Sequence, residues 1–283
     1  MTVQIIDIHP HIISNDAQRY PSNPLRGKQS DWSRERPQTF EQLVAEMDAG
    51  GVAKAAIVQA STYYGFDNSY VADSVASDPQ RFTGVCTINV FAPDAIAVLE
   101  GWMRRGFSGL RIFTGGATHA SDESLLDDPR SYPVWEYAAE KRLPICVQTA
   151  PVGLPKVRDL LERFPRTSLI LDHIGRPKLD DGPPYNDARS LFELAEFRNL
   201  YLKLTPRSFA LAKTGKSTPD AFFGALVRAF GADHIAFGSN LPANEGPMSA
   251  LVAEAKAGLS SLTPADQAMI LSGTAKRLYP ALA

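Results

Sequence analysis

Short apolar runs alternate with amphipathic stretches along the whole sequence. Hydrophobic residues recur with a spacing near 3.6 around 40–47, 98–103, 157–164 and 223–230, which predicts helices there. Most of the apolar runs lack strict alternation of apolar and polar residues, so we expect strands that are buried on both faces of a parallel sheet. The predicted strands cover residues 3–9, 52–60, 81–90, 106–113, 143–149, 167–173, 200–205 and 234–240.

Eight strand–helix units within 283 residues predict a closed (β/α)8 barrel, the TIM barrel. An open doubly wound sheet is the competing fold, but no G-x-G-x-x-G follows the first strand. Thr39 with Gln42 predicts a capping box, and Thr218 and Thr263, each followed by proline, predict helix starts. A further helix is expected at 264–277. No linker or repeat interrupts residues 1–283, so we expect a single domain.

Composition excludes several classes of partner. Lys and Arg total 29 against 31 Asp and Glu, and this balance gives no electrostatic footprint for nucleic acid or an anionic membrane. Cys86 and Cys146 lie in predicted buried strands, which favours free thiols in a reducing compartment. The sequence shows neither a signal-peptide pattern nor an apolar run of roughly 18 residues. We therefore expect a soluble cytoplasmic protein; homo-oligomerisation stays open, because no exposed apolar stripe argues for it.

The longest irregular stretch, residues 10–37, follows the first strand and is rich in proline and arginine. Long structureless segments in compact domains are often functional. At the carboxyl face of a barrel, this segment would form a lid over the site.

Histidines at strand ends carry the candidate chemistry, because a barrel builds its site at the carboxyl ends of its strands. His9 and His11 are two residues apart at the end of the first strand, so both would project into the barrel mouth. His173 closes the sixth strand. Ordinary structural hydrogen bonding is the alternative for each of them. His119 and His234 are assigned to surface or structural roles.

These motifs resemble the amidohydrolase superfamily, in particular its 2-pyrone-4,6-dicarboxylate lactonase-like branch, often labelled metal-dependent hydrolases. The resemblance rests on the HxH of His9 and His11, on LDHIGRP at 171–177, on FGSN-x-P at 237–242 and on the segment 58–85. It implies a hydrolytic site in a deformed TIM barrel, formed by His9, His11, His173 and an acidic residue that closes the eighth strand.

The sequence departs from that pattern at two positions. Asn240 stands where most of the superfamily has an aspartate, and an amide cannot act as a general base near neutral pH. Gln148 stands where metal-dependent relatives commonly have a histidine. Zinc held by His9, His11 and His173 and no metal at all therefore both stay open, since the branch includes metal-independent members.

Two arginines are candidates for binding a substrate carboxylate. Arg111 is a charge within an apolar strand, and Arg207 follows the seventh strand. The resemblance gives Arg111 the place of the arginine that binds a carboxylate in the lactonase. An internal salt bridge, for example to Asp7, Asp172 or Glu245, is the alternative. Lys203, in the seventh strand, is expected to be structural.

Further candidates for substrate contacts are Gln148, Ser61 and Tyr64, the last two from the end of the second strand and the loop after it. The expected partner is thus a small carboxylated molecule. The expected reaction is hydrolysis of a small carboxylated lactone at His9, His11, His173 and Asn240, with a histidine or Glu245 as the base. Decarboxylation or hydration of a related acid, and a binding protein without turnover, are the alternatives.

Overall fold

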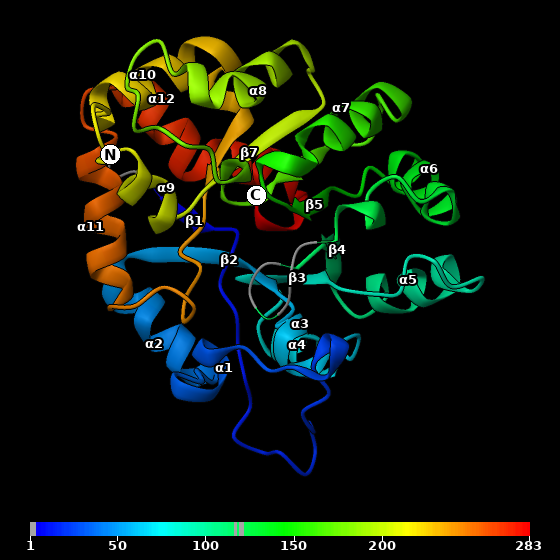
Figure 1. Cartoon of the computed structure of the whole chain (residues 1–283). Helices are drawn as coiled ribbons and strands as arrows, with labels where there is room; N and C mark the ends of the chain where they lie inside the picture. The colour runs from blue at the N-terminus through cyan, green and yellow to red at the C-terminus, as the bar shows by residue number, and fades with distance from the viewer. Residues whose placement is uncertain (1–3, 116–117, 119–121) are drawn as a thin grey trace.

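A computed structural model of the chain describes residues 4–115, 118 and 122–283. All eight predicted strands are present in it, and they pair in parallel in chain order (Figure 1). Residue 3 of the first predicted strand and His119 lie outside the described residues. The strands are β1 (Ile5–Asp7), β2 (Val52–Val58), β3 (Phe82–Cys86), β4 (Phe107–Phe113), β5 (Ile145–Gln148), β6 (Leu169–Leu171), β7 (Leu200–Leu204) and β8 (Ile235–Phe237).

The sheet closes between β8 and β1, which confirms the (β/α)8 barrel. The Ile8 amide donates to the Phe237 carbonyl at 3.1 Å, just beyond the end of β1. Close backbone approach continues past the strands, because a Cβ on Gly238 would lie only 2.6 Å from the Cβ of His9. The close approach of β1 and β8 at this seam, where the barrel closes, therefore requires glycine at 238.

The helices lie outside the strands, and the predicted helix starts are confirmed. Thr39 and Gln42 form the capping box of α2, while Thr218 and Thr263 cap α10 and α12. The helices are α1 (Asp31–Glu35), α2 (Phe40–Gly50), α3 (Ser61–Tyr64), α4 (Ser69–Ser77), α5 (Ala95–Met103), α6 (Tyr132–Lys141), α7 (Leu154–Arg163), α8 (Arg189–Phe192), α9 (Pro206–Leu211), α10 (Pro219–Phe230), α11 (Met248–Gly258), α12 (Pro264–Ala268) and α13 (Thr274–Leu278).

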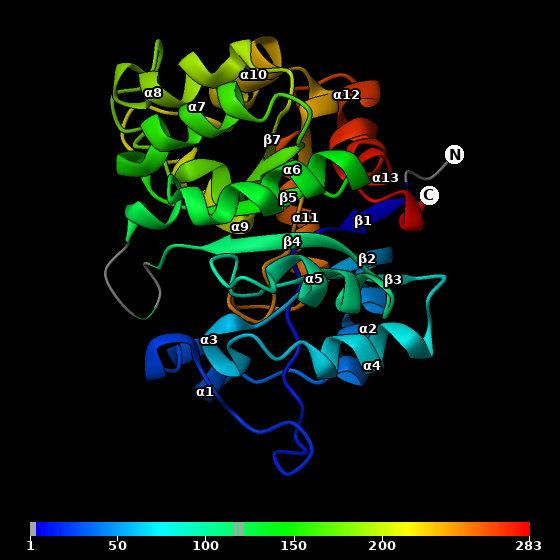
Figure 2. The ribbon, with the colours of Figure 1, turned by 90° about the vertical axis from the view of Figure 1, so that its right-hand side faces the viewer.

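The additional C-terminal helix is also confirmed. It runs from α12 through a π-helical segment, Met269–Gly273, into α13. Seen from the side, α13 and the C-terminus lie at one end of the barrel, and α3 and α9 lie toward the other (Figure 2). Tyr279 and Leu282, just after α13, pack into the barrel interior with small and branched residues of the strands, among them Ile6, Ala56 and Ala236. The end of the described chain thus forms the floor of the barrel.

The segment between β1 and α2 is less lid-like than expected. Much of it loops outward from the barrel (Figures 1 and 2). Its last part forms α1, whose Trp32 ring stacks on His11 with the ring centroids 5.3 Å apart. Cys86 and Cys146 are both buried and free. No helix of the described residues is long and apolar enough to cross a membrane.

Candidate active site

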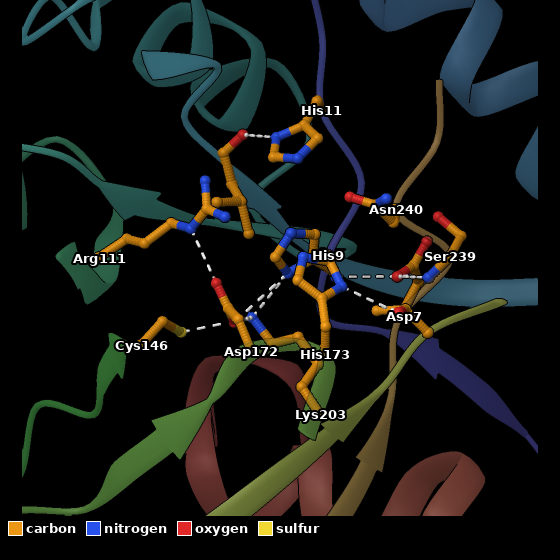
Figure 3. Close-up of polar contacts among 12 residues, drawn as sticks. Asp7, His9, His11, Arg111, Cys146, Asp172, His173, Lys203, Ser239 and Asn240 are labelled. Atoms are coloured by element: carbon orange, nitrogen blue, oxygen red, sulfur yellow. Dashed lines mark hydrogen bonds and ion pairs between the residues drawn. The ribbon is translucent and has the colours of Figure 1, made fainter. Parts of the chain in front are cut away.

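Three histidines meet at the carboxyl ends of β1 and β6. The ring centroid of His9 lies 5.0 Å from that of His11 and 5.0 Å from that of His173 (Figure 3). His9 and His11 follow β1, and His173 follows β6 in a 3-10 turn, Asp172–Gly175. The imidazoles expected to converge from distant parts of the sequence are therefore brought together.

A left-handed turn delivers the sixth-strand residues to the site. His173, Ile174, Gly175 and Arg176 all have positive φ, between 50° and 69°. Three of them are not glycine, and such a residue costs about 1–3 kcal/mol in this region. The strained turn carries His173 and Arg176 to the same cavity. Strain of this kind is typical of functional sites.

A buried ionic network lies below the histidines. Asp172 accepts from Nε of Arg111 at 2.8 Å, and Nζ of Lys203 lies 2.8 Å from its other oxygen. All three side chains are buried. Burial alone would raise the pKa of Asp172, but Lys203 and Arg111 lower it to about 2. The salt bridge considered for Arg111 from the sequence is thus present, with Asp172 as its partner.

All three site histidines are held neutral. Burial, reinforced by the charge of Arg111, lowers the pKa of His11 to about 3. Burial likewise lowers the pKa of His9 and of His173 well below the usual 6.5, and for His9 the charge of Lys203 adds to the effect. Neutral imidazoles offer one donor and one acceptor each.

A cavity of about 630 Å³ opens above this cluster, a volume suited to a small molecule. It does not take in every expected residue: His9 lies behind His11 and His173, outside the lining, and Tyr64 is also outside it, with its hydroxyl accepting from the Ser14 amide at 2.8 Å. The expected residues that do line the cavity are His11, Ser61, Arg111, Gln148, His173, Arg207, Asn240 and Glu245.

One wall of the cavity is positively charged. Arg176 and Arg207 line it, and neither forms an ion pair with any residue in the described part of the chain. Burial, with the charges of Arg207 and Arg111, lowers the pKa of Arg176 to about 10. The side-chain nitrogen and oxygen of the buried Gln148 also have no partner among the described residues. A ligand with an anionic group and further polar atoms would satisfy these groups.

The two bases considered from the sequence differ in their surroundings. Nδ1 of His11 lies 2.7 Å from the carbonyl oxygen of Val58, so it donates there and leaves Nε2 with a lone pair. The Glu245 side chain is 78% exposed and pairs with Arg36 at 3.2 Å. The Asn240 amide donates to Asn244 at 2.6 Å. His11 is therefore the better placed acceptor for a proton.

No functional role follows from the sequence for Asp172, Arg176 or Lys203. Lys203 was expected to be structural, and its acidic partner is Asp172. Asp7 instead accepts from the backbone amides of His9 and Ser239. Lys203, like Arg111, is a charge within an apolar strand, so the same sequence signal marks both residues. Arg176 lies within the LDHIGRP motif at 171–177.

The fold and the site together define a TIM barrel with a polar site at the carboxyl ends of its strands. Comparison with known families is more specific: a model of the amidohydrolase family matches residues 6–281. The chain belongs to the amidohydrolase family. The L-fucono-1,5-lactonase of Burkholderia ambifaria is 25% identical over 246 residues, which cover 84% of this chain and 80% of that one.

Solved structures share the whole fold. A proposed 2-pyrone-4,6-dicarboxylic acid hydrolase from Pseudomonas putida has a TM-score of 0.79 and 20% identity, with 100% of both chains covered. An amidohydrolase from Burkholderia multivorans with bound zinc has a TM-score of 0.76 and 19% identity, covering 98% of this chain and 99% of that chain.

The described site residues of this chain do not fit a zinc ion. Among residues 4–115, 118 and 122–283, no group of three or more His, Cys, Asp or Glu side chains is arranged to hold a metal. The carboxylate of Asp172, 3.6 Å from Nδ1 of His9, is engaged by Lys203 and Arg111. Two buried cations beside the imidazoles oppose the entry of a divalent one.

Proposed function

We propose that the protein hydrolyses a small lactone that carries at least one carboxylate. The observation that carries the proposal is the pairing of two features in one cavity. Neutral imidazoles and guanidinium groups without an ion-pair partner among the described residues line the same cavity. The lactone-hydrolysing relative supports the reaction class, and the charged wall supports the carboxylate.

Arg176 and Arg207 bind the carboxylate in this proposal. A carboxylate that bridges two guanidinium groups removes their mutual repulsion and forms charge-assisted hydrogen bonds. Arg111 already gives its Nε to Asp172, so its remaining N–H groups and the Gln148 amide are left for the carbonyl oxygen of the lactone. These donors would stabilise the negative charge that develops on that oxygen.

His11 is the general base. Its Nε2 takes a proton from water, the oxygen attacks the carbonyl carbon, and the ring C–O bond breaks as the tetrahedral intermediate collapses. The proton on Nε2 then passes to the departing alkoxide, and the product is a hydroxy acid. A pKa of about 3 would make His11 a weak base, but the negative charge that develops on the carbonyl oxygen beside Arg111 offsets one cause of that lowering.

Screening of the purified protein against carboxylated lactones and their methyl esters tests the proposal. We expect turnover of the free acids, a much larger KM for the esters, and loss of kcat in His11→Asn, which retains a donor for the Val58 carbonyl. Asn240→Asp provides a second comparison. If the lactone is hydrolysed only after this substitution, the native chain lacks the base we assign to it.

Two other outcomes would replace the proposal. Tight binding of carboxylated lactones without turnover in the native protein or in Asn240→Asp would identify a binding protein. Release of CO2 from carboxylic acids, without lactone hydrolysis, would identify a decarboxylase.

A further inference from the structure

Lys203 is enclosed by three acceptors in the barrel interior. Its Nζ lies 2.8 Å from Nδ1 of His9, 2.8 Å from Oδ1 of Asp172 and 3.4 Å from Sγ of Cys146 (Figure 3). The side chain is fully buried. An ammonium group has N–H donors and no lone pair, so it can only donate in its hydrogen bonds to His9 and Cys146.

This geometry determines where the proton of neutral His9 lies. Nδ1 must accept from the Lys203 ammonium, and the ring proton is therefore on Nε2. That nitrogen is buried and has no partner among the described residues. His11, whose ring centroid is 5.0 Å away, has the opposite tautomer, because its Nδ1 donates to the Val58 carbonyl. A donor nitrogen and an acceptor nitrogen thus lie side by side in the cluster.

We propose that Lys203 is a positioning residue: it fixes the tautomer of His9 so that Nε2 is a hydrogen-bond donor in the cluster rather than a metal ligand. Its importance for turnover rests on the lactone hydrolysis proposed above. Its effect on the tautomer and on metal binding does not.

The same contacts indicate that Lys203 prevents a hydrogen bond from Nδ1–H of His9 to Asp172. Oδ1 of Asp172 lies 3.6 Å from Nδ1 of His9. Without the ammonium, the carboxylate could accept from Nδ1–H and leave the lone pair on Nε2. A carboxylate behind a histidine in this way is the usual support of a zinc-binding imidazole. Lys203 is therefore one of the groups that separate this site from an arrangement able to bind zinc through His9, His11 and His173.

Histidine ¹⁵N NMR of the wild-type protein tests the tautomers directly. His9→Gln and His11→Asn assign the resonances. At neutral pH we expect a protonated Nε2 and an unprotonated Nδ1 for His9, and the reverse for His11. A protonated Nδ1 on His9 would overturn the proposal, whether or not any substrate has been found.

Lys203→Met tests the consequence, with Cys146→Ala as the matched control. The first change removes the ammonium at similar side-chain length, and the second removes only its weakest acceptor. We expect the proton of His9 to move to Nδ1 in Lys203→Met alone. Zinc affinity, measured by calorimetry with zinc chloride, should rise about 10- to 100-fold over wild type. A folded Lys203→Met protein that binds zinc no better than wild type would contradict the proposal.

Turnover supplies an independent readout once a lactone substrate is known. A positioning residue that does not touch substrate should change kcat and leave KM nearly constant, so we expect kcat in metal-free Lys203→Met to fall about 10- to 100-fold. If no lactone is hydrolysed but the wild-type tautomers are as described, only the proposed function fails. If lactones are hydrolysed and His9 carries its proton on Nδ1, only the role of Lys203 fails.

Discussion

At the scale of single residues, the buried histidines link stability to pH. As the pH falls through about 6.5, an exposed histidine of the unfolded chain binds a proton, whereas folded His11 does so only near 3. Since the unfolded state binds more protons between these values, the free energy of unfolding falls as the pH falls in this window. Each such histidine contributes a slope approaching about 1.4 kcal/mol per pH unit.

His11→Asn isolates one histidine. The raised pKa of buried Asp7 acts in the opposite direction near its own range, but it is common to both proteins and cancels in the comparison. We expect urea unfolding between pH 6 and pH 4.5 to show a shallower loss of stability in His11→Asn than in wild type, by about one proton. Equal slopes would mean that His11 titrates normally in the folded protein.

Arg176 is expected to lower the stability of the folded protein while it binds the substrate carboxylate. Its guanidinium is partly buried, lacks an acidic partner in the described structure and faces the charges of Arg207 and Arg111. Arg176→Met should therefore raise the melting temperature while increasing KM for a carboxylated lactone by about 30-fold or more, as expected for a partly desolvated charge pair. The more exposed Arg207, changed to Met, should have a smaller effect on KM. Thermal unfolding and steady-state kinetics of both variants measure this difference, and unchanged KM in both would remove the arginines from substrate binding.

At the scale of elements, the sequence is sufficient to predict the barrel but not the buried ionic network of Asp172, Arg111 and Lys203. Apolar runs locate all eight strands, because a buried parallel strand is a local signal. The strand ends were less accurate: β1 ends at Asp7, so His9 and His11 converge from the segment after the strand rather than from alternate positions on it. The contact of Lys203 with Asp172 joins β7 to the turn that follows β6, and no local pattern specifies such a pairing.

The seam between β1 and β8 makes a prediction about glycine. In Gly238→Ala, the new Cβ would lie 2.6 Å from that of His9, so the seam must open or His9 must move. We expect a loss of about 1–3 kcal/mol in urea unfolding, the usual cost of overpacking. Gly101→Ala in α5 is the control, because its Cβ would meet only the Arg104 side chain at 4.0 Å. Alanine there should instead stabilise by about 0.5–1 kcal/mol. Equal effects of the two changes would contradict the tight seam.

At the scale of the whole molecule, the two ends of the barrel differ: one holds the cavity and the other is closed by packed side chains. The cavity and its charges lie at the carboxyl ends of the strands, and the C-terminal residues close the opposite end. Tyr279 connects the two. A Cβ on Gly109 of β4, two residues before Arg111, would lie 2.9 Å from its ring. Its hydroxyl lies 3.5 Å from Sγ of Cys146, which in turn accepts from Lys203. The floor therefore supports the ionic network from below.

Two substitutions at Tyr279 separate packing from hydrogen bonding. Tyr279→Ala should leave a void inside the barrel and cost about 3–5 kcal/mol in the free energy of unfolding, as is usual for a large buried ring. Tyr279→Phe keeps the ring and removes only the contact with sulfur, so its cost should stay below about 1.5 kcal/mol. Urea unfolding measures both, and histidine ¹⁵N NMR shows whether the loss of the ring also disturbs the proton on His9. If Tyr279→Phe proves as destabilising as Tyr279→Ala, the hydroxyl rather than the packed ring holds the floor in place.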